Sequence, residues 1–461
     1  MQDAHVAVCC DENTMRIHCK LLETFADIRQ LDIAYNECFD VSFLSKFTHV
    51  QKLHLHTVGI IDYSEISNFK LLQDLSIKHS KNRESIDEID PLDLSVMSTL
   101  PHLRKLTIDS ITVSNTTALS TMIQLKELNL NFTDISDISD LSSLVNLINL
   151  NLNGNPIADI TALKNIKKLK SLVLRSGEKF LIDTKPLINF TNLVELELSG
   201  YQLVDISFLS SLPWLKSLSL NENKISDLSL LQSFTNLECL ALSENHISNI
   251  NILSSLIKLK TLNLGLNSVE DISCLQYLVE LNDLNLESNR VVDISPLSKL
   301  KKLKALNLNH NQIEICDALA DLNCLTDLNL CDNQIECIEP LKSLQNLESL
   351  DVENNEISDI SPISMLVGLN HLDLSGNHVS DVSPLSGLLK IETLHLDLNS
   401  LEDITPLHML TSLIELTISS NAISSLWPIT YLPNLSYVDF TDNHILDTRP
   451  LEILADNMEL Q

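Results

Sequence analysis

Acidic side chains recur in the last third of the sequence, beside pairs of leucines that are separated by one residue. Carboxylates held a few ångströms apart repel one another, so a row of them favours a cationic partner. This pattern predicts recognition of a protein by charge. The candidate partner-binding residues are Asp327, Asp332, Asp351, Glu353, Asp373, Asp397 and Tyr437. The alternative is a solvated acidic surface that only keeps the protein soluble.

Histidines and cysteines could supply a second chemistry, metal binding. His54 and His56 are two residues apart and share a face, and His79 follows on a later strand, so a metal is conceivable. Exposed histidines on a binding surface are far commoner. The cysteines that cluster in sequence are Cys316, Cys324, Cys331 and Cys337. The repeat register scatters them and no C-x-x-C pair occurs, so we interpret them as ordinary thiols and expect no metal and no cofactor.

The sequence contains none of the common catalytic motifs. G-x-S-x-G, H-E-x-x-H, the Walker A loop and G-x-G-x-x-G are all missing. With only 8 glycines in 461 residues, the chain has little of the residue that lets backbone approach phosphate closely. We therefore predict no catalytic residues and no enzymatic activity.

The charge of the chain excludes two classes of partner. Acidic residues number 62 and basic residues 31, which gives a net charge of −31. Nucleic acids and anionic lipid surfaces attract cations, so neither is an expected partner. The amino terminus lacks a basic segment followed by an apolar one, and no apolar stretch reaches the length of a membrane span. These features predict a location in the cytoplasm, or in the nucleus.

A repeat organises the chain. Asparagines recur at steps of 22 residues, at Asn223, Asn245, Asn267, Asn289, Asn311, Asn333, Asn355, Asn377, Asn399, Asn421 and Asn443. Around each asparagine, leucines are spaced by three and two residues and then by threes. A Leu-x-Leu pair fits a short strand with both leucines buried, and spacing by three fits 3₁₀ turns, in which residues i and i+3 eclipse.

Leu-x-Leu equivalents continue from Leu31/Ile33 to Val438/Phe440, which gives about nineteen units. We predict an amino-terminal cap over residues 1–26, repeats over 27–445, and a carboxy-terminal cap over 446–461. The cap at the start is expected to contain a hairpin of Val6–Cys10 and Met15–Cys19, and the cap at the end a helix after Pro450. Insertions near 81–90 and 178–185 lengthen two units without creating a domain boundary.

The pattern L-x-x-L-x-L-x-x-N-x-I-x-D-I-S-P-L-x-x-L, clear from Leu284 to Leu300 and from Leu350 to Leu366, resembles the 22-residue leucine-rich repeat. That class is shared by bacterial internalins and by the leucine-rich-repeat regulatory subunit of protein phosphatase 1. The resemblance implies an α/β solenoid, with a curved concave sheet of short parallel strands and a convex side of 3₁₀ and irregular structure.

Each recurring residue of the repeat has a structural interpretation. The leucines form a continuous core, because no single unit can bury its own apolar face. The asparagines form a ladder that satisfies turn backbone. Asp293 and Asp359 are expected to cap the convex turns, in which Pro296 and Pro362 need no N–H. Function is therefore expected on the variable concave face.

The functional expectation is a non-catalytic protein-binding scaffold that is a monomer by itself. The resemblance makes the regulation of a protein phosphatase catalytic subunit its most concrete form. The alternative is an internalin-like surface or secreted adhesin. The concave face is expected to be basic in the early units, through Lys52, Lys78, Lys105 and the three histidines, and acidic in the late ones.

Overall fold

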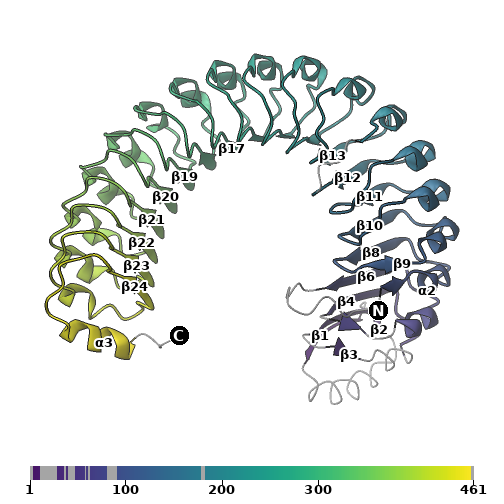
Figure 1. Ribbon diagram of the computed structural model, residues 1–461, viewed down its shortest axis with the longest axis horizontal. Helices are drawn as coiled ribbons and strands as arrows, with labels where there is room; N and C mark the ends of the chain where they lie inside the picture. The colour runs from purple at the N-terminus through teal and green to yellow at the C-terminus, as the bar shows by residue number, and fades with distance from the viewer. Residues whose placement is uncertain are drawn as a thin grey trace. The chain divides into compact units, whose positions relative to one another are not determined.

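The computed structural model describes residues 4–10, 28–35, 38–39, 47–57, 59–60, 63–79, 91–177 and 182–457. The chain divides into two compact units, Met1–Asn223 (unit 1) and Lys224–Gln461 (unit 2). In each unit, short parallel strands line one side and 3₁₀ helices line the other (Figure 1). This arrangement confirms the predicted α/β repeat solenoid.

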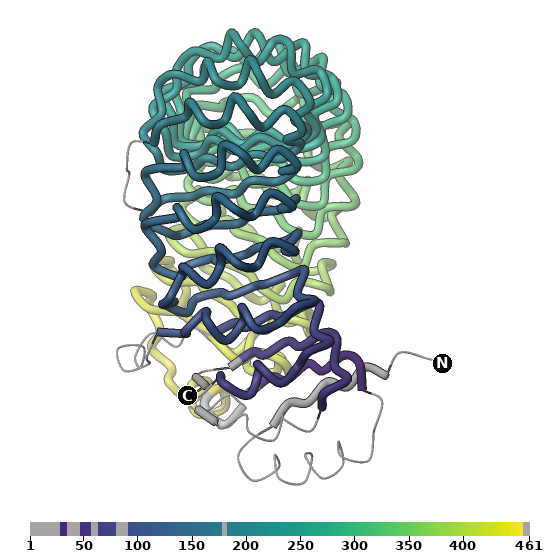
Figure 2. The backbone as a smooth tube through the Cα atoms, turned by 90° about the vertical axis from the view of Figure 1, so that its right-hand side faces the viewer, coloured from purple at the N-terminus to yellow at the C-terminus, as the bar shows by residue number. Residues whose placement is uncertain are grey.

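The sheet of unit 1 is parallel wherever its strand pairs are described. Its strands are β1 (Ala4–Cys10), β2 (Ile28–Tyr35), β4 (Lys52–Thr57), β6 (Asp74–His79), β8 (Lys105–Asp109), β10 (Glu127–Asn131), β11 (Asn149–Asn151), β12 (Ser171–Arg175), β13 (Glu195–Ser199) and β14 (Ser217–Ser219). Two small parallel pairs lie beside it, β3 (Cys38–Phe39) with β5 (Gly59–Ile60), and β7 (Leu92–Asp93) with β9 (Val113–Ser114). Figure 2 shows the coils of unit 1, from purple to teal, stacked on one another.

The sheet of unit 2 is parallel and more regular, with strands of three residues each. They are β15 (Cys239–Ala241), β16 (Thr261–Asn263), β17 (Asp283–Asn285), β18 (Ala305–Asn307), β19 (Asp327–Asn329), β20 (Ser349–Asp351), β21 (His371–Asp373), β22 (Thr393–His395), β23 (Glu415–Thr417) and β24 (Tyr437–Asp439). Leucine faces leucine at the centre of each described pair from β15 to β23, for example Leu284 with Leu306. Each repeat therefore continues the core of the one before it.

The return path of each repeat is a short helix. In unit 1 these are η2 (Ser64–Asn68), α2 (Ser95–Ser98), η4 (Thr116–Thr121), η5 (Ser139–Ser143), η6 (Thr161–Asn165), η7 (Lys185–Asn189) and η8 (Ser207–Ser211). In unit 2 they are η9 (Ser229–Ser233), η10 (Asn251–Ser255), η11 (Ser273–Tyr277), η12 (Ser295–Lys299), η13 (Asp317–Leu319), η14 (Glu339–Ser343), η15 (Ser361–Met365), η16 (Ser383–Gly387), η17 (Thr405–Met409) and η18 (Trp427–Ile429).

The apolar residues spaced by three form the inner side of this return path. Around η12, Ile294, Leu297 and Leu300 are all buried. The N–H of Leu297 donates to the carbonyl of Ile294 at 3.0 Å, and that of Leu300 to the carbonyl of Leu297 at 2.9 Å. These bonds between residues i and i+3 place every third side chain on one face, which is why leucines at that spacing can all reach the core.

Aspartates set the start of the 3₁₀ helices. The N–H of Ser295 donates to Oδ1 of Asp293 at 2.8 Å, and the N–H of Ser361 to Oδ1 of Asp359 at 2.9 Å. Hydrogen bonds to the backbone and side chain of Ser361 lower the pKa of Asp359. Pro362 follows within the first turn of η15, where its lack of an N–H leaves no donor unpaired.

The asparagine ladder joins consecutive repeats. Nδ2 of Asn333 shares its two hydrogens among the carbonyls of Leu308, Leu330 and Cys331, each at 3.0 Å. Its Oδ1 accepts from the N–H of Ile313 at 3.0 Å. Leu308 and Ile313 belong to the preceding repeat, so one side chain that both donates and accepts fixes two turns. An oxygen on its own could not replace it.

Unit 1 fills the same ladder position with different residues. Asn155 repeats the hydrogen-bond pattern of the later asparagines, while Thr133 contributes only a hydroxyl, donated to the carbonyl of Leu130 at 2.9 Å. Tyr201 occupies the ladder position one repeat before Asn223, and its side chain is fully buried. Its backbone N–H donates to Oδ1 of Asn223 at 3.1 Å, so the ladder resumes at that asparagine.

The ends of the described chain differ from the repeats. β1 pairs in parallel with β2, so Val6–Cys10 extends the repeat sheet, whereas Met15–Cys19 lies outside the described residues. Residues 80–90 and 178–181, which include most of the two predicted insertions, also lie outside them. The helix α3 (Arg449–Asn457) closes the repeats of unit 2, and Nε1 of Trp427 donates to Oδ2 of Asp447 at 3.2 Å next to it. None of the described helices is long and apolar enough to cross a membrane.

Candidate protein-binding face

The strand register of unit 2 sets polar side chains in rows. The middle row consists of the residue between the two apolar residues of each Leu-x-Leu pair, which is the last residue of each strand. In this row, Asn329 of β19 pairs with Asp351 of β20, and Asp351 pairs with Asp373 of β21. His395 of β22 follows Asp373. Neighbouring strands are about 4.8 Å apart, so the carboxylates of Asp351 and Asp373 are direct neighbours on one surface. We call Asp327, Asp332, Asp351, Glu353, Asp373 and Asp397 the acidic face.

Residues of the middle row also have a structural task. Oδ1 of Asp351 accepts from the N–H of Glu353 at 3.0 Å, and Oδ1 of Asp373 accepts from the N–H of Ser375 at 2.8 Å. The same bond is made by the asparagines that precede them, Asn263, Asn285, Asn307 and Asn329. The fold therefore needs an acceptor oxygen at this position, which an uncharged amide also supplies. The negative charge of Asp351 and Asp373 is not required by the fold.

Partial burial makes the carboxylates of Asp351 and Glu353 costly to ionise. Burial raises the pKa of Asp351, and the neighbouring charge of Asp373 adds to the shift. Burial likewise raises the pKa of Glu353, again with Asp373 as the next contributor. A cation placed among them would relieve both effects, because it would replace lost hydration and offset the repulsion.

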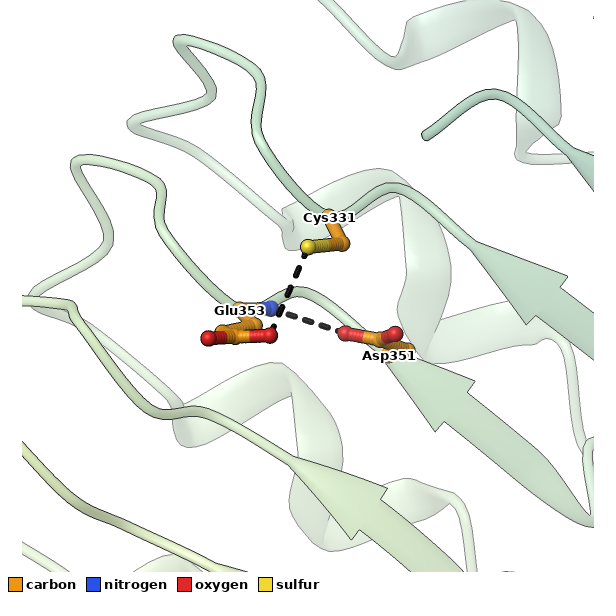
Figure 3. Close-up of side chains that lie close together, drawn as sticks. All are labelled: Cys331, Asp351 and Glu353. Carbon is orange, nitrogen blue, oxygen red and sulfur yellow. Dashed lines mark hydrogen bonds between the residues drawn. The ribbon is translucent and has the colours of Figure 1, made fainter. Parts of the chain in front are cut away.

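Cys331 lies next to Asp351 and Glu353 of the acidic face (Figure 3). It is only 5% exposed, and burial raises the pKa of its thiol. Its Sγ lies 3.5 Å from Oε2 of Glu353 and 3.2 Å from Oδ2 of Asp332. Within the described part of the chain, Cys331, Asp351 and Glu353 are the group whose ligand atoms could hold a metal ion, since these atoms lie within 4.8 Å of one another.

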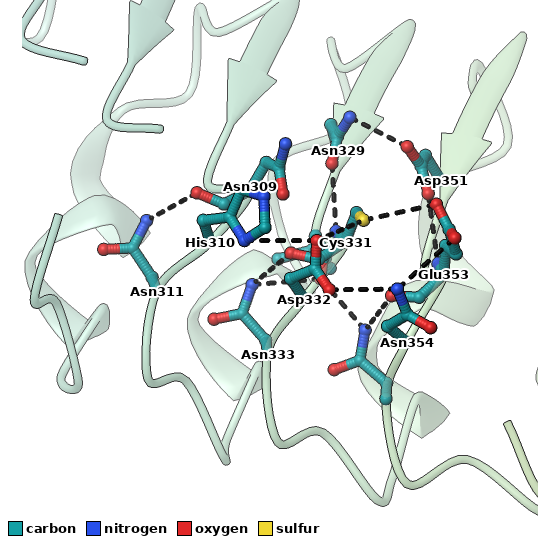
Figure 4. A network of polar contacts seen from close by, with 12 residues as sticks. Asn309, His310, Asn311, Asn329, Cys331, Asp332, Asn333, Asp351, Glu353 and Asn354 are labelled. Atoms are coloured by element: carbon teal, nitrogen blue, oxygen red, sulfur yellow. Dashed lines mark hydrogen bonds and ion pairs between the residues drawn. The ribbon is translucent and has the colours of Figure 1, made fainter. Parts of the chain in front are cut away.

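Asp332 occupies the turn that precedes the ladder asparagine (Figure 4), with a φ of 51°. Its Oδ2 lies 3.1 Å from Nδ1 of His310, and its Oδ1 accepts from Nδ2 of Asn354 at 3.0 Å. The side chain of Asn354 lies against Gly376 of the next repeat. A Cβ atom at position 376 would be only 2.1 Å from Oδ1 of Asn354, so no larger residue fits there without a shift. Internal contacts therefore fix Asp332, although the side chain remains partly exposed.

Asp327 borders a hollow on the same surface. From β17 to β20 the first strand positions alternate between acidic and small residues, in the order Asp283, Ala305, Asp327 and Ser349. The resulting hollow has a volume of about 320 Å³, and its lining includes Asp283, Asp327, Asp351 and His371. Burial raises the pKa of Asp283, and Asp327 contributes by repulsion. The hollow has the size and charge to accept a basic side chain.

Asp397 and Tyr437 lie on later repeats. Oδ1 of Asp397 accepts from the N–H of Ser419 at 2.7 Å, and its Oδ2 accepts from the hydroxyl of Thr417. Tyr437 begins β24, pairs with Glu415 and is 50% exposed. The structure thus clusters Asp332, Asp351 and Glu353 around Cys331, with Asp373 beside them and Asp327 at the hollow. Their contact with a partner stays a prediction.

Three residues of this surface were missing from the predicted binding set: Cys331, Asp283 and His371. Asp283 and His371 open strands β17 and β21, so counting the first strand position along the repeats could have found both. His371 lies close enough to Asp351 to oppose part of its pKa shift, and its ring is 5.8 Å from that of His395. The proximity of the Cys331 thiol to Glu353 depends on side-chain direction, for which the sequence gives no signal.

The early face of unit 1 differs from the expected basic zone. Nδ1 of His54 lies 2.8 Å from Oδ1 of Asp32, and Nε2 lies 3.8 Å from Oδ2 of Asp74. Lys105 is paired with Glu127 at 3.4 Å. These residues, Asp32 excepted, line a hollow of about 470 Å³. The surface is therefore mixed in charge, and carboxylates hold His54 in place.

Comparisons with known proteins agree with the architecture. The family model described as "Leucine Rich repeats (2 copies)" matches residues 123–165, 191–233 and 325–365. An internalin (inlF) from Listeria monocytogenes is 37% identical, with 64% of this chain and 87% of that chain covered and a TM-score of 0.62. The chain belongs to the leucine-rich-repeat family. No curated protein matches its sequence.

Other leucine-rich-repeat proteins share the architecture over a greater part of the chain. A leucine-rich-repeat protein from Leptospira interrogans is 25% identical, with 92% of this chain and 98% of that chain covered by the match and a TM-score of 0.56. The ectodomain of the plant membrane receptor kinase GASSHO1/SCHENGEN3 from Arabidopsis thaliana, 19% identical with a TM-score of 0.62, covers 91% of this chain and 56% of its own, and shows the fold alone. Leucine-rich repeats are a common protein-binding scaffold, and members of the family are generally non-catalytic.

Proposed function

We propose that the chain is a non-catalytic scaffold that binds a basic protein surface through the acidic face. The observation that carries this proposal is the change from asparagine to aspartate in the middle row at Asp351 and Asp373. Asparagine already makes the required turn bond in β16 to β19, so the two adjacent negative charges add repulsion without improving that bond. Binding of a cationic partner offsets this repulsion.

The hollow beside Asp327 supports the same proposal. Ala305 and Ser349 leave space between Asp283, Asp327 and His371, where an arginine or lysine side chain of the partner can enter. Tyr437 adds an exposed aromatic ring at the end of the sheet, a residue type that often anchors protein interfaces. Specific protein interfaces bury about 800 Å² on each side, so the partner contacts more than this hollow.

The test is binding of a captured partner by a charge-removed variant. Asp351→Asn, Glu353→Gln, Asp373→Asn and Asp397→Asn together keep one acceptor oxygen at each position and remove four charges. We expect an intact fold, weaker binding and a shallower dependence of affinity on salt, because salt screens charge attraction. A control set with the same charge change is Glu314, Glu336, Glu348 and Glu392 to Gln, all exposed and outside the acidic face. A chelator in every buffer keeps metal ions out of the comparison.

Two identities for the partner follow from the family. The first is a protein phosphatase catalytic subunit, which would make the chain a regulatory subunit in the cytoplasm or nucleus and predicts direct binding of purified phosphatase 1. The second is a host or surface protein, which would make the chain an internalin-like adhesin outside the cell. The 37% identity to the Listeria internalin favours the second. Locating the protein in intact cells and in the medium separates them.

A further inference from the structure

The thiol of Cys331 lies among more acceptor oxygens than its one proton can satisfy. Oδ2 of Asp332 lies 3.2 Å from Sγ and Oε2 of Glu353 lies 3.5 Å from it. A thiol donates one hydrogen bond, so one of these carboxylates always faces sulfur without a proton between them. The side chain is 5% exposed, which keeps most water from bridging the gap. Oδ2 of Asp332 also lies 3.1 Å from Nδ1 of His310, so the contact that a cation would relieve is the one between the sulfur and Oε2 of Glu353.

The separations of the candidate ligand atoms suit a small metal ion. Sγ of Cys331, Oε2 of Glu353 and a carboxylate oxygen of Asp351 all lie within 4.8 Å of one another. In a tetrahedral zinc site with Zn–S of about 2.3 Å and Zn–O of about 2.0 Å, ligand atoms lie roughly 3.3–3.8 Å apart. The Sγ to Oε2 distance of 3.5 Å already falls in this range. The carboxylate oxygen of Asp351, within 4.8 Å of both, completes the group of three ligand atoms.

We propose that Cys331, Asp351 and Glu353 bind one Zn²⁺ ion, with the fourth position open to water on the concave side. Sulfur as a ligand favours zinc over Ca²⁺ and Mg²⁺, which prefer sites made of oxygen alone. Binding displaces the thiol proton to solvent and forms a zinc–sulfur bond, and no oxidation or reduction is involved. This inference departs from the expectation of no metal, and it does not rest on the proposed partner.

Neighbouring residues hold two of the ligands in place. Nδ2 of Asn329 donates to Oδ2 of Asp351 at 2.9 Å, and the N–H of Glu353 donates to Oδ1 of the same carboxylate at 3.0 Å. Nδ2 of Asn354 donates to Oε1 of Glu353 at 3.3 Å, which leaves Oε2 toward the sulfur. Such outer contacts orient ligands before the metal arrives. Asp332 and Asp373 add negative charge around the site without serving as ligands.

The test is zinc and cobalt binding by the full chain without a histidine tag or partner. We expect the wild type to bind one Zn²⁺ more than Cys331→Ser in equilibrium dialysis. With Co²⁺ in place of Zn²⁺, the wild type should show the charge-transfer absorption of a cobalt–thiolate bond. Cys331→Ser should lose the absorption that comes from the bond between cobalt and Cys331. Glu353→Gln should weaken zinc binding at least about 10-fold, the lower end of the effect of disturbing a metal environment.

Cys324→Ser is the matched control, because Cys324 is an exposed thiol of the same repeat region and lies outside the cluster. It should retain the stoichiometry and the cobalt spectrum of the wild type. Asp351→Asn is a second test, which keeps the turn bond to Glu353, removes the charge and the oxygen that accepts from Asn329, and should also weaken zinc binding. Equal zinc stoichiometry and equal cobalt absorption in the wild type and Cys331→Ser, with both variants folded, would overturn the proposal.

Discussion

Two rows of polar side chains run through unit 2 with the same 22-residue spacing, the asparagine ladder and the middle row of the strands. In the ladder, Asn333 donates to three carbonyls and accepts from one N–H. In the middle row, Asp351 and Asn329 each accept the N–H of the turn with one oxygen, and the second oxygen of Asp351 accepts from Nδ2 of Asn329. The ladder therefore requires an amide, whereas the middle row requires only an acceptor.

This difference shows where the fold leaves room for function. Every ladder position of unit 2 from Asn245 to Asn443 is asparagine, because neither a carboxylate nor a hydroxyl can make all of its bonds. The middle row changes from asparagine to aspartate at Asp351 and to histidine at His395 without a break in the strand register. Side chains that vary in a constant backbone setting are the ones available for a partner.

The largest expected loss of stability comes from placing an aspartate, the residue of the acidic middle row, at a ladder position. Asn333→Asp removes the two amide hydrogens and places a carboxylate against the carbonyls of Leu308 and Leu330. We expect a loss of at least about 3 kcal/mol in unfolding free energy, the scale of an unpaired buried charge. Urea unfolding measures it. The reciprocal change, Asp351→Asn, should not destabilise the protein, and equal losses for the two changes would contradict the comparison.

A milder change tests the ladder by removal alone. Asn333→Ala leaves the N–H of Ile313 and the buried carbonyls without their partner, which should cost roughly 1–3 kcal/mol. Gln334→Ala, at the exposed next position, should cost less than about 0.5 kcal/mol, because the backbone bond from its N–H to Ile313 remains. Thermal melting of both variants decides, and equal shifts would mean that the assigned ladder register is wrong.

The acidic row should show a small effect of opposite sign. Asp351→Asn combined with Asp373→Asn removes two neighbouring half-buried charges while it keeps both turn bonds. We expect the melting temperature to rise by less than about 1 °C, as expected for a few tenths of a kcal/mol in a chain of this size. A fall in the melting temperature at low salt would show that these charges stabilise the free protein.

The smallest expected effect lies on the convex side and depends on pH. Hydrogen bonds to Ser361 lower the pKa of Asp359 below its ordinary value of 3.8. A pKa lowered by folding contributes stability that is present above the unfolded pKa and is lost as pH falls through the folded one. Asp359→Asn should therefore melt slightly lower than the wild type at neutral pH.

As the pH falls below 3.8 and through the lowered folded pKa, the difference between Asp359→Asn and the wild type should shrink, because the wild-type carboxyl then becomes protonated as well. Asn249 holds the same turn in another repeat, where its Oδ1 accepts from the N–H of Asn251 at 3.0 Å, so the substitution fits the backbone. A difference in melting temperature that stays constant with pH would show that the charge of Asp359 is not involved.

Much of the fold could be predicted from the sequence because the repeat acts locally. The pairs Leu-x-Leu and the spacing by three determined the strands and 3₁₀ helices, for example β17 and η12. The parallel pairing of β1 with β2 was not predicted, because an apolar strand such as Val6–Cys10 fits a local hairpin or a sheet edge equally well. Tyr201 in a ladder position also breaks the rule on which the prediction relied.

The candidate site was only partly predictable. Register alone placed Asp351 and Asp373 on one surface, since successive repeats stack residue on residue. The contacts of Asp397 with Ser419 and Thr417, and those of Cys331 with its carboxylates, depend on side-chain rotation, which repeat counting cannot supply. In unit 1, the pairing of His54 with Asp32 changed an expected basic zone into a mixed one.

The most direct test of the central claim is the salt dependence of partner binding with and without the two middle-row charges. For Asp351→Asn with Asp373→Asn, in chelator-containing buffer, we expect about 10-fold weaker binding at low salt, from two ion pairs of roughly 0.7 kcal/mol each, and a shallower salt slope. Glu314→Gln with Glu336→Gln, which changes the net charge equally, should bind like the wild type. Unchanged affinity and slope in the middle-row variant would mean that the acidic face only solubilises the protein.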